Sequence, residues 1–171
     1  VVGYQNTTDN VAGHDGKVAI GAKNTSTNNA STAVGNENKA TGGAATAVGA
    51  GNTASGKASV ALGNVNNADA KAAIAIGTYN NVNYTKGSWQ TTPKHAGEYS
   101  TVVGNYSSAT GTSASAMGVY TNATGAGSFA AGYNNNANGQ NSVAIGSENT
   151  SHVADTVTLG QFNNAKTMGG I

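Results

Sequence analysis

The side chains that could carry out metal or catalytic chemistry are few and lie far apart in the sequence. Histidine occurs at His14, His95 and His152. Only His152 has a possible second ligand close by, Asp155, and no third ligand accompanies this pair. We therefore expect no metal site. The chain has no cysteine, which excludes disulfides, thiolate catalysis and the usual zinc sites.

Motifs for nucleophilic, acid–base and phosphate chemistry are also missing. Serine is plentiful, but no Gly-x-Ser-x-Gly sequence singles one out as a nucleophile. The 7 acidic residues are scattered and form no acid–base pair. The glycine-rich stretch Gly49-Ala50-Gly51 is not followed by a helical pattern that could complete a phosphate site. The sequence predicts a protein that is not an enzyme, with no catalytic residues and no cofactor.

The composition excludes an ordinary globular core. Val, Ile, Leu and Phe make up about 14% of the 171 residues, below the roughly 20% that globular chains contain. Disorder is also disfavoured, because only 9% of residues are charged and the net charge is +1. All 8 cations are lysines without a basic cluster, so we expect no nucleic-acid partner. No apolar run reaches 18 residues, so we expect no membrane contact by this segment.

What organises the chain is a repeat built on an apolar residue followed by glycine, here called the anchor glycine. Eight of the ten intervals between successive anchors are 14 residues long, and the other two are 18 and 27. A fixed short period is the signature of a solenoid, so residues 1–171 are expected to form one repeat domain. The anchors are Gly3, Gly21, Gly35, Gly49, Gly63, Gly77, Gly104, Gly118, Gly132, Gly146 and Gly160.

Each repeat predicts two short strands and two corners. Segments such as Ser142–Ile145 alternate small and bulky residues with the period of a strand. A shorter Asn-x-Ala strand follows, with asparagine three residues after most anchors. Glycine supplies the positive φ or close approach that a corner needs. Asparagine can hydrogen-bond to its copy in the next coil, about 4.8 Å away.

Alanine two residues before the anchor, as in Ala19, Ala33 and Ala47, forms an apolar but flat face. We expect a thin coil to hold one or two bulky side chains, and this flat face to meet neighbouring copies of the chain. A subunit that cannot close its own core is commonly stabilised by symmetric assembly, so the monomer is not expected to be stable alone.

The coil Asn141-Ser142-Val143-Ala144-Ile145-Gly146 and its variants, repeated in register, resemble the YadA-like head of trimeric autotransporter adhesins. The resemblance covers about residues 1–160, and 161–171 is similar to the start of a neck or connector. It implies an all-β, left-handed parallel β-roll, three chains side by side in a homotrimer, and display from the outer membrane at the bacterial cell surface.

The resemblance also implies a function. Heads of this family bind host extracellular-matrix or cell-surface proteins, so collagen-like proteins, fibronectin or laminin are the expected partners. Repeats of the Asn-Ser-Val-Ala-Ile-Gly type contribute to collagen binding in relatives, which assigns ligand binding to Asn141, Ser142, Val143, Ala144, Ile145 and Gly146. The alternative is a passive spacer in a surface fibre. An ice-binding solenoid is disfavoured, because its threonine rank (Thr32, Thr46, Thr101) is interrupted by apolar residues.

The longest interval between anchors contains an insertion, about residues 84–99, with the only tryptophan and the only proline. Insertions in solenoids leave as loops, often on the binding face, so Lys86, Trp89 and Lys94 are candidate ligand contacts. Packing of Trp89 against the roll is the alternative. Five tyrosines near corners could bind a sugar or a peptide edge, or fill corners between subunits: Tyr4, Tyr79, Tyr106, Tyr120 and Tyr133.

Overall fold

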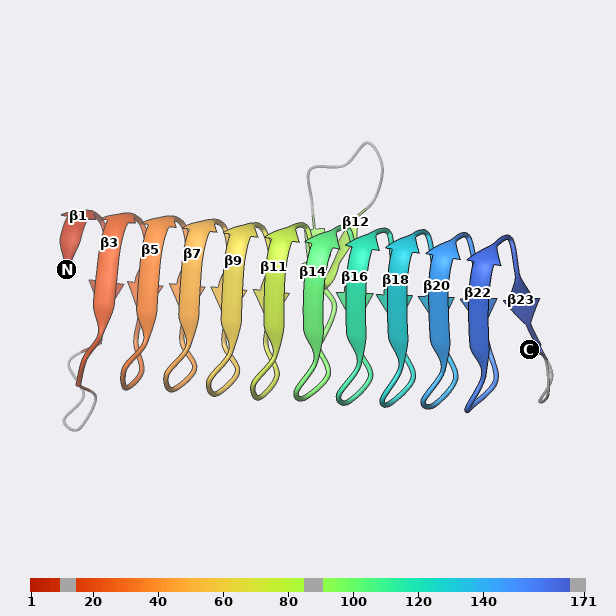
Figure 1. Cartoon of the computed structure of the whole chain (residues 1–171). Helices are drawn as coiled ribbons and strands as arrows, with labels where there is room; N and C mark the ends of the chain where they lie inside the picture. Colours follow the sequence, from red (N-terminus) through yellow and green to blue (C-terminus); the bar gives the residue numbers. More distant parts are fainter. Residues whose placement is uncertain (10–14, 85–90, 167–171) are drawn as a thin grey trace.

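The computed structural model describes residues 1–9, 15–84 and 91–166, and within them the chain winds into a straight solenoid (Figure 1). One face of the solenoid is a parallel sheet of 11 strands in the described part of the chain. Its strands, in spatial order, are β1 (Val2–Tyr4), β3 (Val18–Ala22), β5 (Thr32–Asn36), β7 (Thr46–Ala50), β9 (Val60–Asn64), β11 (Ile74–Thr78), β14 (Thr101–Asn105), β16 (Ser115–Val119), β18 (Phe129–Tyr133), β20 (Val143–Ser147) and β22 (Val157–Gln161).

The opposite face consists of two-residue strands, which form two parallel sheets of five strands each in the described residues. The first sheet contains β2 (Thr7–Thr8), β4 (Thr25–Ser26), β6 (Lys39–Ala40), β8 (Thr53–Ala54) and β10 (Asn67–Ala68). The second contains β15 (Ser108–Ala109), β17 (Asn122–Ala123), β19 (Asn136–Ala137), β21 (Thr150–Ser151) and β23 (Asn164–Ala165). An antiparallel hairpin, β12 (Val82–Tyr84) and β13 (Thr91–Pro93), separates them in the chain.

The register confirms the 14-residue parallel solenoid. Each anchor glycine pairs with the next anchor, as Gly21 does with Gly35. The pairing continues across the insertion, where Gly77 pairs with Gly104. The additional residues are therefore accommodated outside the long sheet. The sequence placed the insertion at 84–99, whereas the hairpin spans 82–93 and the coil resumes before Ala96, which is buried. Residues 10–14, in the smaller break, lie outside the described residues.

Glycine at the anchor is required by both conformation and space. Gly63 has φ +115°, and a Cβ on it would lie 2.1 Å from the carbonyl oxygen of Gly77. The left-handed region is costly for residues with a Cβ, and successive coils approach too closely to admit one.

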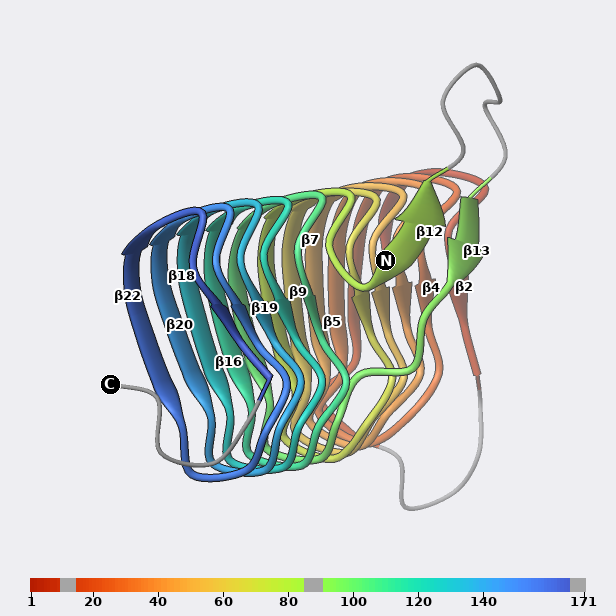
Figure 2. The same ribbon diagram turned by 90° about the vertical axis from the view of Figure 1, so that its right-hand side faces the viewer.

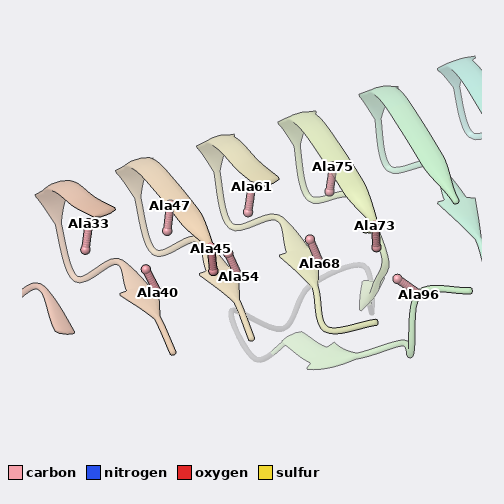
Figure 3. Close-up of a cluster of buried hydrophobic side chains, with 10 residues drawn as sticks. All are labelled: Ala33, Ala40, Ala45, Ala47, Ala54, Ala61, Ala68, Ala73, Ala75 and Ala96. Carbon is pink, nitrogen blue, oxygen red and sulfur yellow. The ribbon is translucent and has the colours of Figure 1, made fainter. Parts of the chain in front are cut away.

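The interior corrects one expectation from the sequence. The alanines two residues before the anchors are fully buried inside their own coil rather than forming an outer face. Figure 3 shows Ala33 on the long strand and Ala40 on the short strand pointing toward one another. The two strands of a coil lie close together, so the inward side chains are mostly alanines, with Val102 as a larger member in β14. The bulky residues of the long strands consequently point outward, where Ile20 is 42% and Ile145 37% exposed.

The asparagines three residues after the anchors form the predicted row inside the corner. Asn38 Nδ2 donates to the carbonyl oxygens of Val34 at 3.0 Å and Gly49 at 2.7 Å, and to Asn24 Oδ1 at 3.0 Å. Asn38 Oδ1 in turn accepts from the backbone N–H of Asn52 at 3.1 Å. Buried polar groups of each corner are thus satisfied by the neighbouring coils. Ser107 and Thr121 replace asparagine in this row.

The solenoid contains no helix of the length and hydropathy needed to span a bilayer, as far as the described residues go.

Candidate functional site

The hairpin is the largest departure from the repeat and lies outside the roll, beside the short strands and away from the long sheet (Figure 2). Its strands pair antiparallel, with Val82 opposite Pro93 and Tyr84 opposite Thr91. β12 and β13 therefore lie on the short-strand side of the solenoid. A solenoid can extend a loop in this way without disturbing its stacked coils.

Asn81 connects the two short-strand sheets at the point where the hairpin leaves. It is four residues after its anchor glycine, the place where the other coils begin a short strand. Asn81 Nδ2 donates to the carbonyl oxygen of Asn67 at 3.0 Å, and Asn81 Oδ1 accepts from the N–H of Ala109 at 2.9 Å. Its buried carboxamide thus occupies the place of a peptide group between β10 and β15.

The returning end of the hairpin is attached to the preceding coil by side chains. Asp69 Oδ1 accepts from the N–H of Ala96 at 2.7 Å, and Asp69 Oδ2 lies 2.6 Å from His95 Nδ1. Asn67 Nδ2 donates to the carbonyl oxygen of Lys94 at 2.9 Å. These contacts give His95 and Asp69 a structural role at the base of the hairpin.

The predicted ligand contacts of the insertion are only partly described. Lys94 lies at the base of the hairpin and is half-buried. Its backbone N–H donates to the carbonyl oxygen of Asn81 at 2.8 Å. Lys86 and Trp89 lie outside the described residues. Of the insertion, the described geometry places β12, β13 and Lys94 on the short-strand side.

The hexapeptide predicted to bind ligand lies three long strands from the hairpin, on the corner before β20 and on β20 itself. Asn141 is exposed on the corner, with φ +52°, and Asn141 Nδ2 donates to Asp155 Oδ1 at 3.0 Å. Ser142 and Ala144 are fully buried inside the coil. Val143 and Ile145 point outward from the long sheet. The structure thus does not bring this coil together with the hairpin.

The outer face of the long sheet has a continuous apolar column. It consists of the residue before each anchor glycine, and these residues are half-buried or exposed in every coil. Its most exposed members are Val2, Ile20, Val103, Met117, Ile145 and Leu159. The sequence pattern favoured the flat alanine row as the outer face, whereas the structure buries that row and exposes the bulky residues. The alternation of alanine and bulky residues along each strand can be seen in the sequence, but it does not show which of the two sides faces inward.

Three of the tyrosines form a stack on the corner that follows the long sheet. The ring centroids of Tyr79 and Tyr106 are 5.2 Å apart with an interplanar angle of 7°, and those of Tyr106 and Tyr120 are 5.2 Å apart at 14°. Tyr133 meets Tyr120 edge-on, with centroids 6.2 Å apart. Their proximity follows from the period, since residues at one place in successive coils lie side by side.

Electrostatic features are sparse on this surface. Lys71 Nζ lies 5.2 Å from the ring centroid of Tyr99, on the opposite corner. A hydrogen bond to Tyr99 and the charge interaction with it raise the pKa of Lys71. The described residues contain no group of three or more His, Cys, Asp or Glu side chains that could hold a metal ion. His14 lies outside them.

Comparison with known proteins identifies the repeat. The family model described as YadA head domain repeat (2 copies) matches residues 18–38, 40–66, 54–80, 96–121 and 123–149. The matches end at 80 and resume at 96, on either side of the hairpin. No curated protein matches the chain. Because the matched segments cover more than half of the sequence, the chain belongs to the YadA head family, a family of non-enzymatic adhesins of bacterial surfaces.

Proposed function

We propose that the chain is the head of a trimeric adhesin, with three left-handed rolls side by side, displayed from a bacterial outer membrane. Its task is attachment to a host extracellular-matrix or cell-surface protein, for which collagen-like proteins, fibronectin and laminin are candidates. Attachment is multivalent and non-catalytic. Family membership supports the adhesin class, and the trimer rests on the apolar column of the long sheet.

The apolar column is the observation that carries the assembly. It repeats in every coil, with Ile20, Met117 and Ile145 between 37% and 46% exposed. A stripe of this length is unusual on a monomer and is typical of an interface. Because every copy presents the same stripe at the same spacing, parallel copies can pack side by side with their coils aligned.

This assembly assigns different roles to the residues of the hexapeptide. Val143 and Ile145 would pack between copies, while Ser142, Ala144 and Gly146 form the coil that supports them. Asn141 on the exposed corner would be the contact available to a ligand. Lys86, Trp89 and Lys94 of the insertion would supply the other contacts to a host protein.

Light scattering on the whole chain tests the assembly. We expect a species near three times 16.7 kDa, and substitution of Met117→Lys with Ile145→Lys should lower this mass by burying charge at the interface. Glu148→Lys, on an exposed corner, is the matched control and should leave the mass unchanged. A folded monomer of the unsubstituted chain would refute the trimer.

Attachment to host cells tests the role of the insertion. Residues 85–90 can be replaced by Asn-Gly, which favours the two-residue turn of a hairpin and keeps β12 and β13. Residues 94–97 should be kept, because Ala96 belongs to the buried core. We expect attachment to fall while the trimer persists. Unchanged attachment would favour the spacer and place binding elsewhere.

A further inference from the structure

The hairpin that interrupts the repeat has strand edges that no further strand covers. In the described part of the chain, β12 pairs with β13 and with no other strand. A strand edge of this kind presents backbone N–H and C=O groups to which another chain can add. Figure 2 shows both strands beside the short strands and away from the long sheet. The two outer edges of the hairpin are therefore candidates for binding an additional strand.

The direction of the backbone groups on these edges follows from the pairing. The N–H of Lys94 donates to the carbonyl oxygen of Asn81 at 2.8 Å, and these two residues continue the register of the hairpin. Residue pairs of an antiparallel ladder alternate between pairs that are bonded to each other and pairs whose N–H and C=O groups point outward. Because this first pair is bonded, the next pair points outward. It consists of Val82 and Pro93.

Proline makes the two outer edges of the hairpin unequal. The same alternation turns Tyr84 and its partner Thr91 outward. On β13, Pro93 has no N–H, so Thr91 supplies the outward N–H of this edge. On β12, Val82 and Tyr84 together direct two N–H and two C=O groups outward. Proline at an edge is one of the features by which proteins prevent strand addition, and the hairpin carries it on β13 but not on β12.

The neighbouring edges inside the roll are closed. The two short-strand sheets end at β10 and β15, on either side of the insertion in the chain. Asn81 Nδ2 donates to the carbonyl oxygen of Asn67, and Asn81 Oδ1 accepts from the N–H of Ala109. One side chain thus occupies both of these edges. Strand addition at the insertion is thereby directed to the outer edge of β12 and not to the roll.

The base of the hairpin is held in place, which prepares this edge for binding. Asp69 Oδ1 accepts from the N–H of Ala96, and Asn67 Nδ2 donates to the carbonyl oxygen of Lys94. A hairpin of two strands is only marginally stable in water, so a third strand would stabilise it. Fixing the base in advance lowers the conformational entropy that is lost when the third strand binds.

The position of the hairpin favours a peptide from another protein over a second copy of the chain. In the proposed trimer the copies meet through the apolar column of the long sheet, whereas β12 and β13 lie on the short-strand side. The hairpins of one trimer therefore lie away from the contact between its copies. A collagen triple helix does not fit the edge, because its three chains wind around one another in polyproline II conformation. An extended peptide segment presents the backbone groups that a strand edge requires.

We propose that the outer edge of β12 binds an extended, proline-free peptide segment of a host protein by strand addition. The inference rests on the proposed function, since it names the kind of partner that the adhesin head recognises. The added strand hydrogen-bonds to the backbone of Val82 and Tyr84 and forms a three-stranded sheet with β12 and β13. Backbone hydrogen bonds supply affinity for peptides of different sequence.

Titration calorimetry of the whole chain tests the proposal with an end-blocked peptide of sequence Glu-Thr-Val-Thr-Val-Thr-Glu, whose central residues favour strands. We expect saturable binding of this probe. The same peptide with both valines replaced by proline lacks N–H groups and should bind about tenfold more weakly. A peptide of Pro-Hyp-Gly repeats, which forms a collagen helix, should not bind to the edge. Amide hydrogen exchange at Val82 and Tyr84 should slow when the probe binds.

Variants of the hairpin locate the binding edge. Tyr84→Pro removes an outward N–H and should weaken binding of the probe about tenfold. Tyr84→Val keeps this N–H and is the control for loss of the tyrosine side chain. Thr91→Pro introduces proline at the paired position of β13 and is the control for the effect of proline on the hairpin. Both controls should bind the probe like the unsubstituted chain, and slow amide exchange at Thr92, between the outward pairs, shows that the hairpin persists in each variant.

Strand addition at β12 would be overturned by absence of probe binding, by unchanged binding in Tyr84→Pro, or by an equal loss in Thr91→Pro. Light scattering that shows trimers pairing as their concentration rises, with the pairing lost in Tyr84→Pro, would also overturn it, because the edge would then bind a second copy. A chain that attaches to host cells but ignores the probe refutes the peptide site and leaves the adhesin function intact. A chain that binds the probe but does not attach to cells supports the peptide site and refutes the adhesin function.

Discussion

Each buried asparagine after an anchor glycine makes several hydrogen bonds to the backbone with one side chain. Asn52 Nδ2 donates to the carbonyl oxygens of Val48 and Gly63, and Asn52 Oδ1 accepts from the N–H of Asn66. One side chain thus satisfies backbone groups of its own coil and of the next. Serine can take this place, since Ser107 Oγ lies within hydrogen-bond distance of the carbonyl oxygens of Asn105 and Gly118 and accepts from the N–H of Thr121.

Substitution of Asn52→Ala should destabilise the roll. The N–H of Asn66 and the carbonyl of Gly63 would each lose a buried partner, at a cost of about 2–4 kcal/mol in the free energy of unfolding. Denaturant unfolding followed by circular dichroism measures this change. Asn36→Ala, at an exposed place in β5, is the control and should change stability by less than about 0.5 kcal/mol. Equal effects of the two substitutions would contradict the role of the row.

Adjacent glycines offer a second residue-scale test. A Cβ on Gly42 would lie 2.0 Å from the carbonyl oxygen of Gly56, whereas a Cβ on Gly43 would meet only Asn28 Oδ1 at 4.0 Å. Gly42→Ala should therefore cost more than about 3 kcal/mol because backbone must move, and Gly43→Ala less than about 0.5 kcal/mol. Thermal unfolding compares the two directly. A similar melting temperature for both variants would show that the coils are not packed this closely.

At the scale of elements, the long sheet and the short-strand sheets respond differently to the insertion. The long sheet pairs Gly77 with Gly104 as if nothing intervened. The short strands are interrupted, and Asn81 bridges the gap through its side chain. The long sheet offers five paired residues per coil and the short sheets only two, so the short side yields to an insertion at lower cost.

Replacement of Asn81 by alanine should loosen the junction between β10 and β15. The carbonyl of Asn67 and the N–H of Ala109 would lose their partners. We expect faster amide hydrogen exchange at Ala109 and in β15, with unchanged protection in β11 and β14. Asn64→Ala, outside the junction, provides the comparison. Uniformly faster exchange over both sheets would show that Asn81 supports the whole roll instead of the junction.

For the whole molecule, the proposed function depends on repetition. About 11 coils at roughly 4.8 Å each give a rod of about 50 Å that presents the same corners many times. Linked weak contacts gain avidity without a deep pocket. Because only 9% of residues are charged, binding to this surface depends little on long-range electrostatic attraction.

Avidity predicts a dependence on ligand density. Trimers binding a surface densely coated with the host protein should dissociate at least tenfold more slowly than from a dilute coating, because several contacts must break together. Surface plasmon resonance over a range of coating densities measures the rates. The chain with charged substitutions in the apolar column, Met117→Lys with Ile145→Lys, should no longer assemble and should therefore lose this dependence. Equal rates at all densities would rule out multivalent attachment.

The comparison of sequence with structure shows which features are local. The period, the strands, the corners and the asparagine row follow from the spacing of Gly and Asn, because each residue interacts with its own copy 14 positions away. The break in the 14-residue period locates the insertion, but it does not give the residues at which the insertion begins and ends. The sequence shows the tyrosines one by one, whereas their stacking depends on the contact between successive coils.

The sequence by itself determined a two-strand parallel solenoid with an insertion in its sixth interval. Only the tertiary structure decided which side of the long strands faces inward. The alternation of Ala and bulky residues is the same whichever side is buried, so the pattern of Ala144 and Ile145 cannot settle it. The narrow space between the two strands of a coil decides which side is buried, because it holds alanine more readily than isoleucine. That distance places the apolar column outside, where another copy can cover it.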